Sequence, residues 1–517
     1  MWQNHRSLFL VLLVLTAARM VLAATFELSP DEAYYHLWTQ HMDWSFYSKG
    51  PGVASAIWLG TAVFGDGPFG IRFWSPLCGL GTSLMIYRLG RGLFDGNTAA
   101  WSAVLVNVTP IFNAGSILMT IDPPSIFFWT LALVTLWSAL HRASPWSLYW
   151  VATGLAIGIG FLFKYTNAFL LLGLVLVLVC VPKWRGLWRR PGPWMLLGAF
   201  GLCTLPVLIW NAQHGWITLI HLLERGRIGE STGYHIVPLL EYLGLHAGVY
   251  SPLVFVGLLW ALWVGLRHFG RDAGEAFLIC FSAPIVVFYF LLSLKETGEP
   301  NWTAPGFVGL LVLLVHAFHK ARLSGPWRAG LRVGALGLAV IVSALALNFD
   351  LLRKAGASIP YSRDPLLRLR GGQELAQAAD QFIRAQHAES GQAPFLIAQR
   401  YQLSALLHYY LPADCPVLRP DPSFPRAFIP ESPAIRNQFS FWPRYDQRQP
   451  GANPVSPYIG RDALFFSDAP SGDSAPTEVE QAFARVEPIG LVEIRRMDLP
   501  LRRLRVFSCQ GYRGTDL

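Results

Sequence analysis

The chain has 517 residues, of which 53% are hydrophobic and 14% are charged, and its formal net charge is +9. Ordinary soluble domains carry roughly 25% charged residues, so this composition excludes a typical soluble protein and indicates a membrane protein. Abundant aromatic residues exclude a disordered chain, and 47 glycines without a three-residue period exclude a collagen-like one.

Charged residues divide the chain into two regions. Residues 1–348 contain 21 Lys or Arg and 14 Asp or Glu, whereas residues 349–517 contain 20 and 18 in half the length. The first region suits lipid and the second suits water, so we predict a transmembrane domain over 1–348 and a water-exposed domain over 349–517. Neither region has the basic excess of a nucleic-acid binder, and no nucleic acid partner is expected.

Apolar runs in the first region are long enough to cross a hydrocarbon core of about 30 Å, which takes roughly 17 to 25 helical residues. Eleven such runs lie at 7–25, 69–89, 98–118, 124–140, 146–163, 166–182, 193–211, 248–266, 275–293, 301–318 and 329–348. The first run resembles a secretory signal, but Arg19 interrupts it and further runs follow. We therefore expect it to remain as a membrane anchor.

The loop charges indicate an orientation, because cytoplasmic loops near spans are enriched in Lys and Arg. With the N-terminus inside, 14 of the 21 basic residues of the first region fall on the cytoplasmic side, and 11 of its 14 acidic residues fall on the outer side or near it. An odd number of spans then exports the C-terminal region.

The first outer loop, about 27–68, is the longest, and its aromatic and aliphatic residues recur at helical spacing between Gly and Pro breaks. This pattern predicts short helices lying at the membrane interface. A similar stretch follows Trp210, so the two stretches are expected to frame a cavity at the bilayer surface.

The C-terminal region alternates short apolar runs with Pro-rich loops. The runs lie at 394–398, 415–418, 462–467, 490–494 and 501–509, with a helical pattern at 402–411 and a Pro-rich, irregular stretch at about 411–460. This alternation predicts a small α/β domain.

Cysteine and histidine spacing gives no metal site. The six Cys include no Cys-x-x-Cys pair, and His36 and His41 lie in an aromatic-rich stretch where interfacial histidines are more common than ligands. No metal or other cofactor is expected. Cys415 and Cys509 fall in the exported region, where one disulfide or two free thiols are both compatible with the sequence.

Polar clusters lie at the outer ends of predicted spans, at 29–32, 47–51, 121–124 and 164–165. Each has a structural alternative. Ser29 and Glu32 form a capping-box pattern, so the two acids there can serve only to start a helix. Asp122 before a proline is a natural N-cap, and Lys49 and Lys164 can extend to lipid headgroups.

Together, the clusters resemble the polytopic glycosyltransferases of the C-type superfamily (GT-C), in the bacterial branch related to protein O-mannosyltransferases and lipid A aminoarabinose transferases. The resemblance rests on Asp31-Glu32, an aromatic-x-Lys-x-Pro element at 47–51, Asp122-Pro123-Pro124, and the segments 163–166, 210–216, 299–302 and 400–402. Many relatives have Asp-[His/Lys]-Pro-Pro where this chain has Ser48-Lys49-Gly50-Pro51, so the Lys is kept and a neighbouring acid is not.

This resemblance implies an α-helical polytopic fold of about 11 spans with interfacial helices and a periplasmic α/β domain, in a bacterial inner membrane. It also implies transfer of a hexosyl or pentosyl group from a polyprenyl-phosphate donor, typically undecaprenyl phosphate, to a lipid, glycan or protein acceptor. No nucleotide sugar is available on that side, so the sugar must arrive on a lipid carrier. The leaving group is a single phosphate, whose charge Lys or Arg can meet.

The expected mechanism is a single inverting displacement. Asp31 accepts the proton of the acceptor hydroxyl, Glu32 supports Asp31, and Lys49 steadies the departing phosphate. Asp122 positions the acceptor or orients the site.

Further residues are expected to contact substrate. Tyr47 and Tyr165 are expected to bind substrate, and Lys164 is expected either to contact the donor or to support residues that do. Arg225 and Arg227 are candidates for contact with the donor phosphate, and Arg400 and Tyr401 are assigned to acceptor choice. For the two donor arginines the alternative is pairing with Glu224 and Glu230 on a solvated face.

Two rival functions make different predictions. A transporter or glycolipid flippase would place coupling carboxylates near the bilayer midplane, whereas the acids singled out here fall at span ends. A non-catalytic assembly scaffold would leave Asp31 and Asp122 far apart, whereas a transferase places both at one cavity.

Overall fold

The structure is a computed structural model that describes residues 5–142, 144–226, 233–321, 325–432, 434–446, 456–468 and 474–514. The chain forms two compact units. One comprises Met1–Thr25 and Asp43–Leu347, and the other comprises Phe26–Met42 and Asn348–Leu517. We call them the helical unit and the mixed unit. The segment Phe26–Met42 thus packs with the C-terminal region, although it interrupts the helical unit in the sequence.

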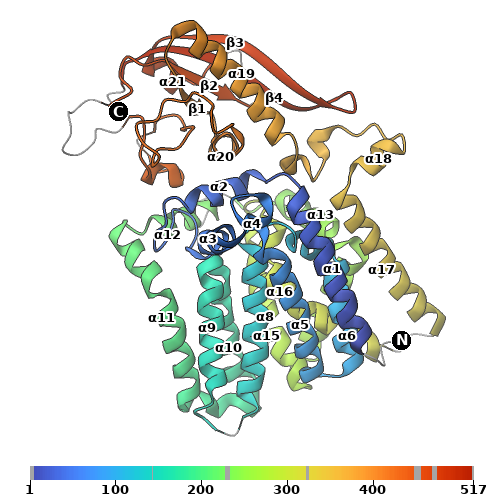
Figure 1. Ribbon diagram of the computed structural model, residues 1–517. Helices are drawn as coiled ribbons and strands as arrows, with labels where there is room; N and C mark the ends of the chain where they lie inside the picture. The colour runs from blue at the N-terminus through green and yellow to red at the C-terminus, as the bar shows by residue number, and fades with distance from the viewer. Residues whose placement is uncertain are drawn as a thin grey trace. The chain divides into compact units, whose positions relative to one another are not determined.

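The helical unit is a bundle in which long helices such as α5, α8, α9 and α11 run beside one another (Figure 1). Its helices are α1 (His5–Thr25), α3 (Gly52–Phe64), α4 (Pro68–Arg72), α5 (Trp74–Leu93), α6 (Gly96–Val108), α7 (Pro110–Gly115), α8 (Asp122–Leu140), α9 (Leu148–Phe163), η1 (Tyr165–Ala168), α10 (Phe169–Cys180), η2 (Pro182–Arg189), α11 (Pro191–Gln213), α12 (Ile217–Arg225), α13 (Ile236–Tyr250), α14 (Pro252–Arg267), α15 (Ala273–Leu292), η3 (Pro300–Trp302), α16 (Ala304–Lys320) and α17 (Gly325–Leu347).

Five helices of the described chain are long and apolar enough to cross a membrane, and the number rises to seven if each of two bent helix pairs is one span. The long helices lie at 6–25, 122–140, 191–213, 273–292 and 325–347. Every predicted apolar run contains a helix, so the polytopic helical architecture is confirmed.

Some predicted runs are divided between two helices. The run 98–118 consists of α6 and α7, because Pro110 has no N–H with which to continue the hydrogen-bond ladder of α6. The pair α13 and α14 bends by 113° at Ser251, and Pro252 begins the second helix. Helix boundaries therefore follow the prolines as well as the apolar pattern.

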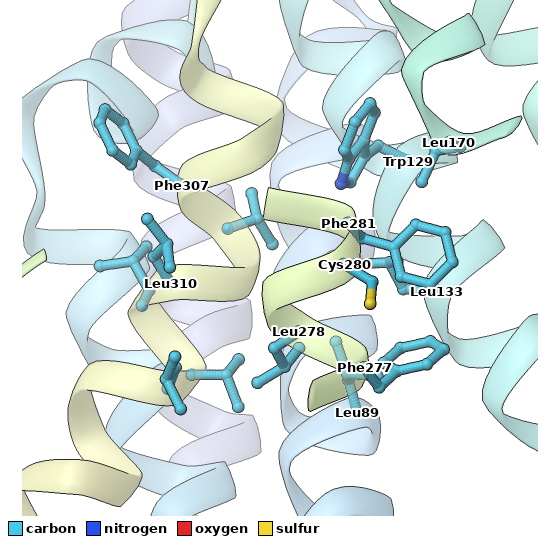
Figure 2. Close-up of a cluster of buried hydrophobic side chains, with 14 of the residues drawn as sticks. Leu89, Trp129, Leu133, Leu170, Phe277, Leu278, Cys280, Phe281, Phe307 and Leu310 are labelled. Carbon is cyan, nitrogen blue, oxygen red and sulfur yellow. The ribbon is translucent and has the colours of Figure 1, made fainter. Parts of the chain in front are cut away.

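The core of the helical unit lies where α8, α15 and α16 meet (Figure 2). Trp129 and Leu133 of α8, Phe277 and Phe281 of α15, and Leu310 of α16 are each at most 1% exposed. A helix that is apolar on most of its circumference is buried on most of it. The start of α8 and the segment before α16 carry residues of the candidate site.

The mixed unit has a four-stranded sheet in the order β1-β2-β4-β3, in which β1 and β2 are parallel and the other pairs are antiparallel. Its elements are α2 (Pro30–Trp38), α18 (Asp350–Lys354), η4 (Tyr361–Arg363), η5 (Leu367–Leu369), α19 (Gly372–Ser390), β1 (Phe395–Ala398), α20 (Tyr401–Tyr410), η6 (Gln438–Phe441), β2 (Ala463–Ser467), α21 (Thr477–Ala482), β3 (Phe483–Arg496) and β4 (Leu499–Tyr512). The helix at 402–411 and four of the five predicted strand runs are confirmed. Residues 415–418 form no strand, since Pro416 cannot donate to a ladder.

Both faces of the sheet are buried. Leu396 and Leu464 face α19 and α20, whereas Phe395 and Phe465 face aromatic residues of the Pro-rich stretch, among them Tyr458. The Pro-rich stretch therefore covers the second face of the sheet. Cys415 and Cys509 belong to the clusters on opposite faces and are free, which favours the alternative of two free thiols.

Candidate functional site

The loop before α3 is fixed to the segment that follows α11. Trp210 Nε1 donates to Asp43 Oδ2 at 2.7 Å, and Thr218 Oγ1 donates to the carbonyl oxygen of Phe46 at 3.2 Å. The ring of Tyr47 lies 4.6 Å from the ring of His221 on α12. The two outer stretches singled out in the sequence thus contact each other in the helical unit.

Two glycines bring the same loop against the end of α9. A Cβ atom at Gly50 would lie 2.4 Å from the carbonyl oxygen of Leu162, and one at Gly52 would lie 2.8 Å from the Phe163 ring. Only glycine permits this approach of the two backbones. Lys49 in the loop and Lys164 at the end of α9 consequently line the same cavity.

This cavity, which we call the basic cavity, has a volume of about 240 Å³ and contains the side chains of Lys49, Lys164 and Arg225. Arg225 lies 5.3 Å from the centre of the Trp302 ring and forms no ion pair with any residue that the structure describes. The rest of the wall is largely apolar, from Phe169, Leu222, Leu223, Phe288, Leu292 and Trp302. Cations beside apolar side chains suit an anionic group attached to a hydrocarbon chain.

A buried ion pair holds one wall of the basic cavity. Lys164 Nζ lies 2.6 Å from Asp122 Oδ1 and donates to the carbonyl oxygen of Asn301 at 2.9 Å. Asn301 Nδ2 donates to Asp122 Oδ2 at 2.8 Å. The Lys164 and Asp122 side chains are 8% and 15% exposed, so the pair connects α8, α9 and the segment before α16 rather than lipid headgroups.

A second cavity, of about 190 Å³, is lined by Asp122 and Asn301 together with other residues, among which Thr82, Ser83, Asn107 and Ser116 are polar. The Arg19 guanidinium, 2% exposed, donates to Asn107 Oδ1 at 2.8 Å and to Asn113 Oδ1 at 2.8 Å. The charge that interrupts the first apolar run is therefore buried against amides, one of which, Asn107, lines this cavity. Asn107 and Asn113 were not predicted as site residues, because they lie in an apolar run that its composition assigns to lipid.

The pKa of His221 reflects its burial and the positive charge of the basic cavity. Burial, followed by the charges of Lys49 and Arg225, lowers the pKa of His221 to about 4. Burial, with a contribution from Glu224, raises the pKa of Tyr47. His221 is therefore neutral at physiological pH, and Lys49 and Arg225 supply the positive charge.

Tyr165, the remaining donor residue predicted in the helical unit, lines the basic cavity, and its hydroxyl lies 3.3 Å from Ser45 Oγ. Arg227 and Glu230 fall outside the described residues. Asn301 and Trp302 were not assigned a role from the sequence, although they lie in a segment that carries the resemblance. Among the described residues, no group of three or more His, Cys, Asp or Glu is placed to hold a metal ion.

Asp31 and Glu32 begin α2 in the mixed unit. Ser29 N donates to Glu32 Oε2 at 2.9 Å and Glu32 N donates to Ser29 Oγ at 3.2 Å, which is a complete capping box. Glu32 is fully buried. The Asp31 side chain is 39% exposed, and its Oδ2 lies 3.8 Å from Arg368 Nη1. The capping interpretation therefore fits Glu32, whereas Asp31 keeps an accessible carboxylate.

The other predicted residues of the mixed unit are Arg400 and Tyr401. Arg400 forms two hydrogen bonds to Asp468, at 3.1 and 2.6 Å. The Tyr401 ring lies 4.5 Å from the ring of Tyr34 on α2. The residues predicted for one site thus divide between the two units, and the structure describes each group within its own unit.

Several known proteins are similar to this chain in sequence. Residues 48–210 match the family described as dolichyl-phosphate-mannose-protein mannosyltransferase. The lipid A galacturonosyltransferase RgtD of Rhizobium johnstonii is 27% identical over 353 residues, covering 67% of this chain and 72% of that protein. An undecaprenyl phosphate-alpha-4-amino-4-deoxy-L-arabinose arabinosyl transferase of Pseudomonas aeruginosa is 30% identical over 355 residues, covering 63% of this chain and 62% of that one.

The fold also has a solved counterpart. The crystal structure of ArnT from Cupriavidus metallidurans bound to undecaprenyl phosphate is similar with a TM-score of 0.62 and 18% identity, and the match covers 98% of both chains. At this identity the likeness establishes the fold alone. It extends over both the helical bundle and the C-terminal sheet.

Proposed function

The chain belongs to the GT-C superfamily of glycosyltransferases, in the branch related to protein O-mannosyltransferases and lipid A aminoarabinose transferases, and we propose that it transfers one sugar from a polyprenyl-phosphate carrier to a lipid acceptor. The carrier is undecaprenyl phosphate and the acceptor is a glycolipid of the lipid A type, as the names of the relatives suggest. The sugar is a hexosyl or pentosyl group.

The basic cavity is the observation that carries this proposal. Lys49 and Arg225 present positive charge, Lys164 is held by Asp122, and the remaining wall is apolar. A polyprenyl phosphate has both parts that this cavity suits, an anionic head and a hydrocarbon tail. Phosphate oxygens pair well with ammonium and guanidinium groups, and such pairs strengthen where water is scarce.

The proposed reaction is a single displacement at the anomeric carbon. Asp31 takes the proton of the acceptor hydroxyl while the hydroxyl oxygen forms its bond to that carbon. The bond from the anomeric carbon to the phosphate oxygen breaks, and its electron pair leaves with the phosphate. Lys49 and Arg225 stabilise the charge that develops there.

Topology is part of the proposal. Eleven membrane crossings with a cytoplasmic N-terminus place residues 349–517 on the periplasmic side of a bacterial inner membrane, and α3 and α12 lie at the membrane interface. The clustering of Lys and Arg in alternate loops supports this orientation.

Replacing Asp122 by Ala is expected to destabilise the chain by about 3–5 kcal/mol, because it leaves the Lys164 ammonium buried without its carboxylate. The double variant Asp122→Leu with Lys164→Met is expected to recover most of that stability, since it removes both charges, but not to recover transfer activity. Thermal unfolding in detergent and turnover, measured on the same preparations, separate the two effects. Full activity of the double variant would remove this pair from the reaction.

Carrier binding is expected to strengthen as pH falls from about 6.5, the usual pKa of histidine, toward 4. The negative charge of a bound phosphate raises the low pKa of His221. Carrier binding therefore takes up a proton at pH values between about 4 and that raised pKa. Each unit by which the pKa rises adds up to about tenfold in affinity. The measurement is the Kd for a polyprenyl-phosphate sugar, which stays singly charged, and the same pH slope in His221→Phe would contradict the prediction.

The proposed activity is tested with purified chain in bilayer nanodiscs, supplied with a panel of undecaprenyl-phosphate sugars and lipid A. Mass spectrometry is expected to find lipid A heavier by one sugar residue with at least one donor. Donor loss without such a product would indicate hydrolysis, and donor movement between leaflets without chemistry would indicate a flippase.

A further inference from the structure

We propose that the mixed unit holds its own site for the anionic saccharide headgroup of the acceptor, in a cavity at the carboxyl edge of β1 and β2. This inference rests on the proposed transferase function and names the part of the acceptor that the mixed unit recognises. The described residues that line this cavity, and α2, all lie within that unit.

Three chain segments leave the sheet at the same edge. Strands β1 and β2 run parallel, and Phe428 bridges in parallel to Ile397 on β1. Their continuations are joined there, because Ser467 Oγ donates to Gln399 Oε1 at 2.6 Å and Arg400 pairs with Asp468. Ligands of open α/β sheets bind in the crevice outside the carboxyl ends of parallel strands.

The cavity at this edge has a volume of about 440 Å³, larger than the basic cavity of 240 Å³. Ligand-binding clefts commonly range from about 300 to 1,000 Å³. Its lining includes Arg400, Tyr401, Glu431, Arg436, Phe439 and Arg444. The cavity therefore has room for a ligand and presents both charged and aromatic side chains to it.

Several of these polar groups are held in place by protein partners. Asp468 fixes Arg400, Asp446 fixes Arg444, and the hydroxyl of Tyr512 donates to Glu431, which is 4% exposed. Guanidinium and carboxylate groups are planar and can hydrogen-bond to two neighbouring hydroxyls of a sugar ring. Because protein partners already hold these side chains in place, binding a ligand costs less conformational entropy.

One arginine of the cavity is the reason for proposing an anionic ligand. Arg436 is exposed and forms no ion pair with a residue in the described ranges. Its guanidinium is therefore available to a phosphate or carboxylate on the saccharide, for which the geometry of Arg is well suited. The partly exposed ring of Tyr401, which also lines the cavity, offers an apolar surface to the C–H side of the sugar.

The cavity shares residues with the surface that holds α2. Tyr34 of α2 stacks on Phe439 at 5.8 Å and lies 4.5 Å from Tyr401, and its hydroxyl accepts a hydrogen bond from Gln438 N at 2.8 Å. Asp31 lies one turn earlier on the same helix. The headgroup site and the proposed base therefore belong to one packed unit, which fixes the acceptor relative to Asp31.

The test measures binding of a phosphorylated glucosamine disaccharide without acyl chains to the full chain in nanodiscs. Arg436→Ala is expected to weaken binding about tenfold or more, the loss of one charge-assisted contact. Arg485→Ala is the matched control, because Arg485 is an exposed arginine of the same unit that pairs with Glu487 on β3. The control is expected to bind within about twofold of the unsubstituted chain, as surface pairs contribute little.

Undecaprenyl phosphate binding is measured on the same samples, together with Lys49→Ala. Arg436→Ala is expected to leave carrier binding unchanged. The inference is overturned if the unsubstituted chain does not bind the disaccharide, or if Arg436→Ala and Tyr401→Ala bind it as the control does. Carrier binding that is indifferent to Lys49→Ala would instead count against the proposed function, so the two failures are distinguishable.

Discussion

Asp31→Asn is expected to lower the turnover number by about 10² to 10⁴, the usual contribution of a positioned general base. Asn preserves the shape of the side chain but cannot take up the acceptor proton. The fold is expected to remain intact, because the Asp31 side chain is 39% exposed and its contact with Arg368 is a surface ion pair. Single-turnover rates at saturating donor and acceptor give the measurement.

Glu374→Gln is the matched control for this variant. Glu374, like Asp31, is an acidic residue in the first turn of a helix of the mixed unit, here α19. Its charge stabilises that helix end by less than about 1 kcal/mol, and its removal is expected to leave turnover unchanged. If Asp31→Asn transferred sugar at the rate of the control, Asp31 would not be the base.

Lys49→Ala is expected to weaken binding of undecaprenyl phosphate about 10- to 100-fold. Hydrogen bonds to charged groups contribute roughly 1.5–3 kcal/mol, and Arg225 remains in the cavity to bind the phosphate in part. Turnover is expected to fall further, because the charge on the leaving phosphate grows in the transition state. Lys49→Arg keeps the charge and is expected to recover part of the affinity.

Lys183→Ala controls for the general effect of removing a lysine from the helical unit. Lys183 is exposed after α10, where its Nζ lies 3.3 Å from His141 Nε2 and outside the basic cavity. Carrier affinity is expected to stay within about twofold, as for other surface charges. Equal losses in Lys49→Ala and Lys183→Ala would contradict the assignment of the basic cavity to the phosphate.

The sequence predicted what depends on local pattern. The apolar runs predicted the helices of the helical unit, because the length and hydrophobicity of each run can be read without the others. Ser29 and Glu32 predicted the start of α2, because a capping box involves only one helical turn. The strands at 395–398 and 463–467 were predictable from short apolar runs between turn residues. Pro110 and Pro252 also mark helix starts, because proline is favoured at the first position of a helix.

What the sequence could not predict depends on contacts between distant segments. Lys49 and Lys164 share a cavity because Gly50 allows the loop to approach Leu162. No sequence pattern in either segment predicts this contact. The association of α2 with the C-terminal region depends on Tyr34 meeting Tyr401 and Phe439, although chain order places α2 between membrane segments.

Buried polar side chains in apolar runs were also beyond prediction. Arg19 and Asn107 lie in runs that composition assigns to lipid, and hydrogen bonds to other polar groups accommodate both. Arg19 donates to Asn107 and to Asn113, and Asn107 donates to Ser83. A polar residue within a span predicts a partner, but periodicity alone does not identify which helix supplies it.

The fate of the carrier phosphate tests the central claim most directly. A donor labelled in both sugar and phosphate, given to the purified chain in nanodiscs for one turnover, is predicted to yield undecaprenyl phosphate and glycosylated lipid in equal amounts, with the anomeric configuration of the sugar inverted. Free sugar, intact donor transferred to the opposite leaflet, or a product with retained configuration would contradict it.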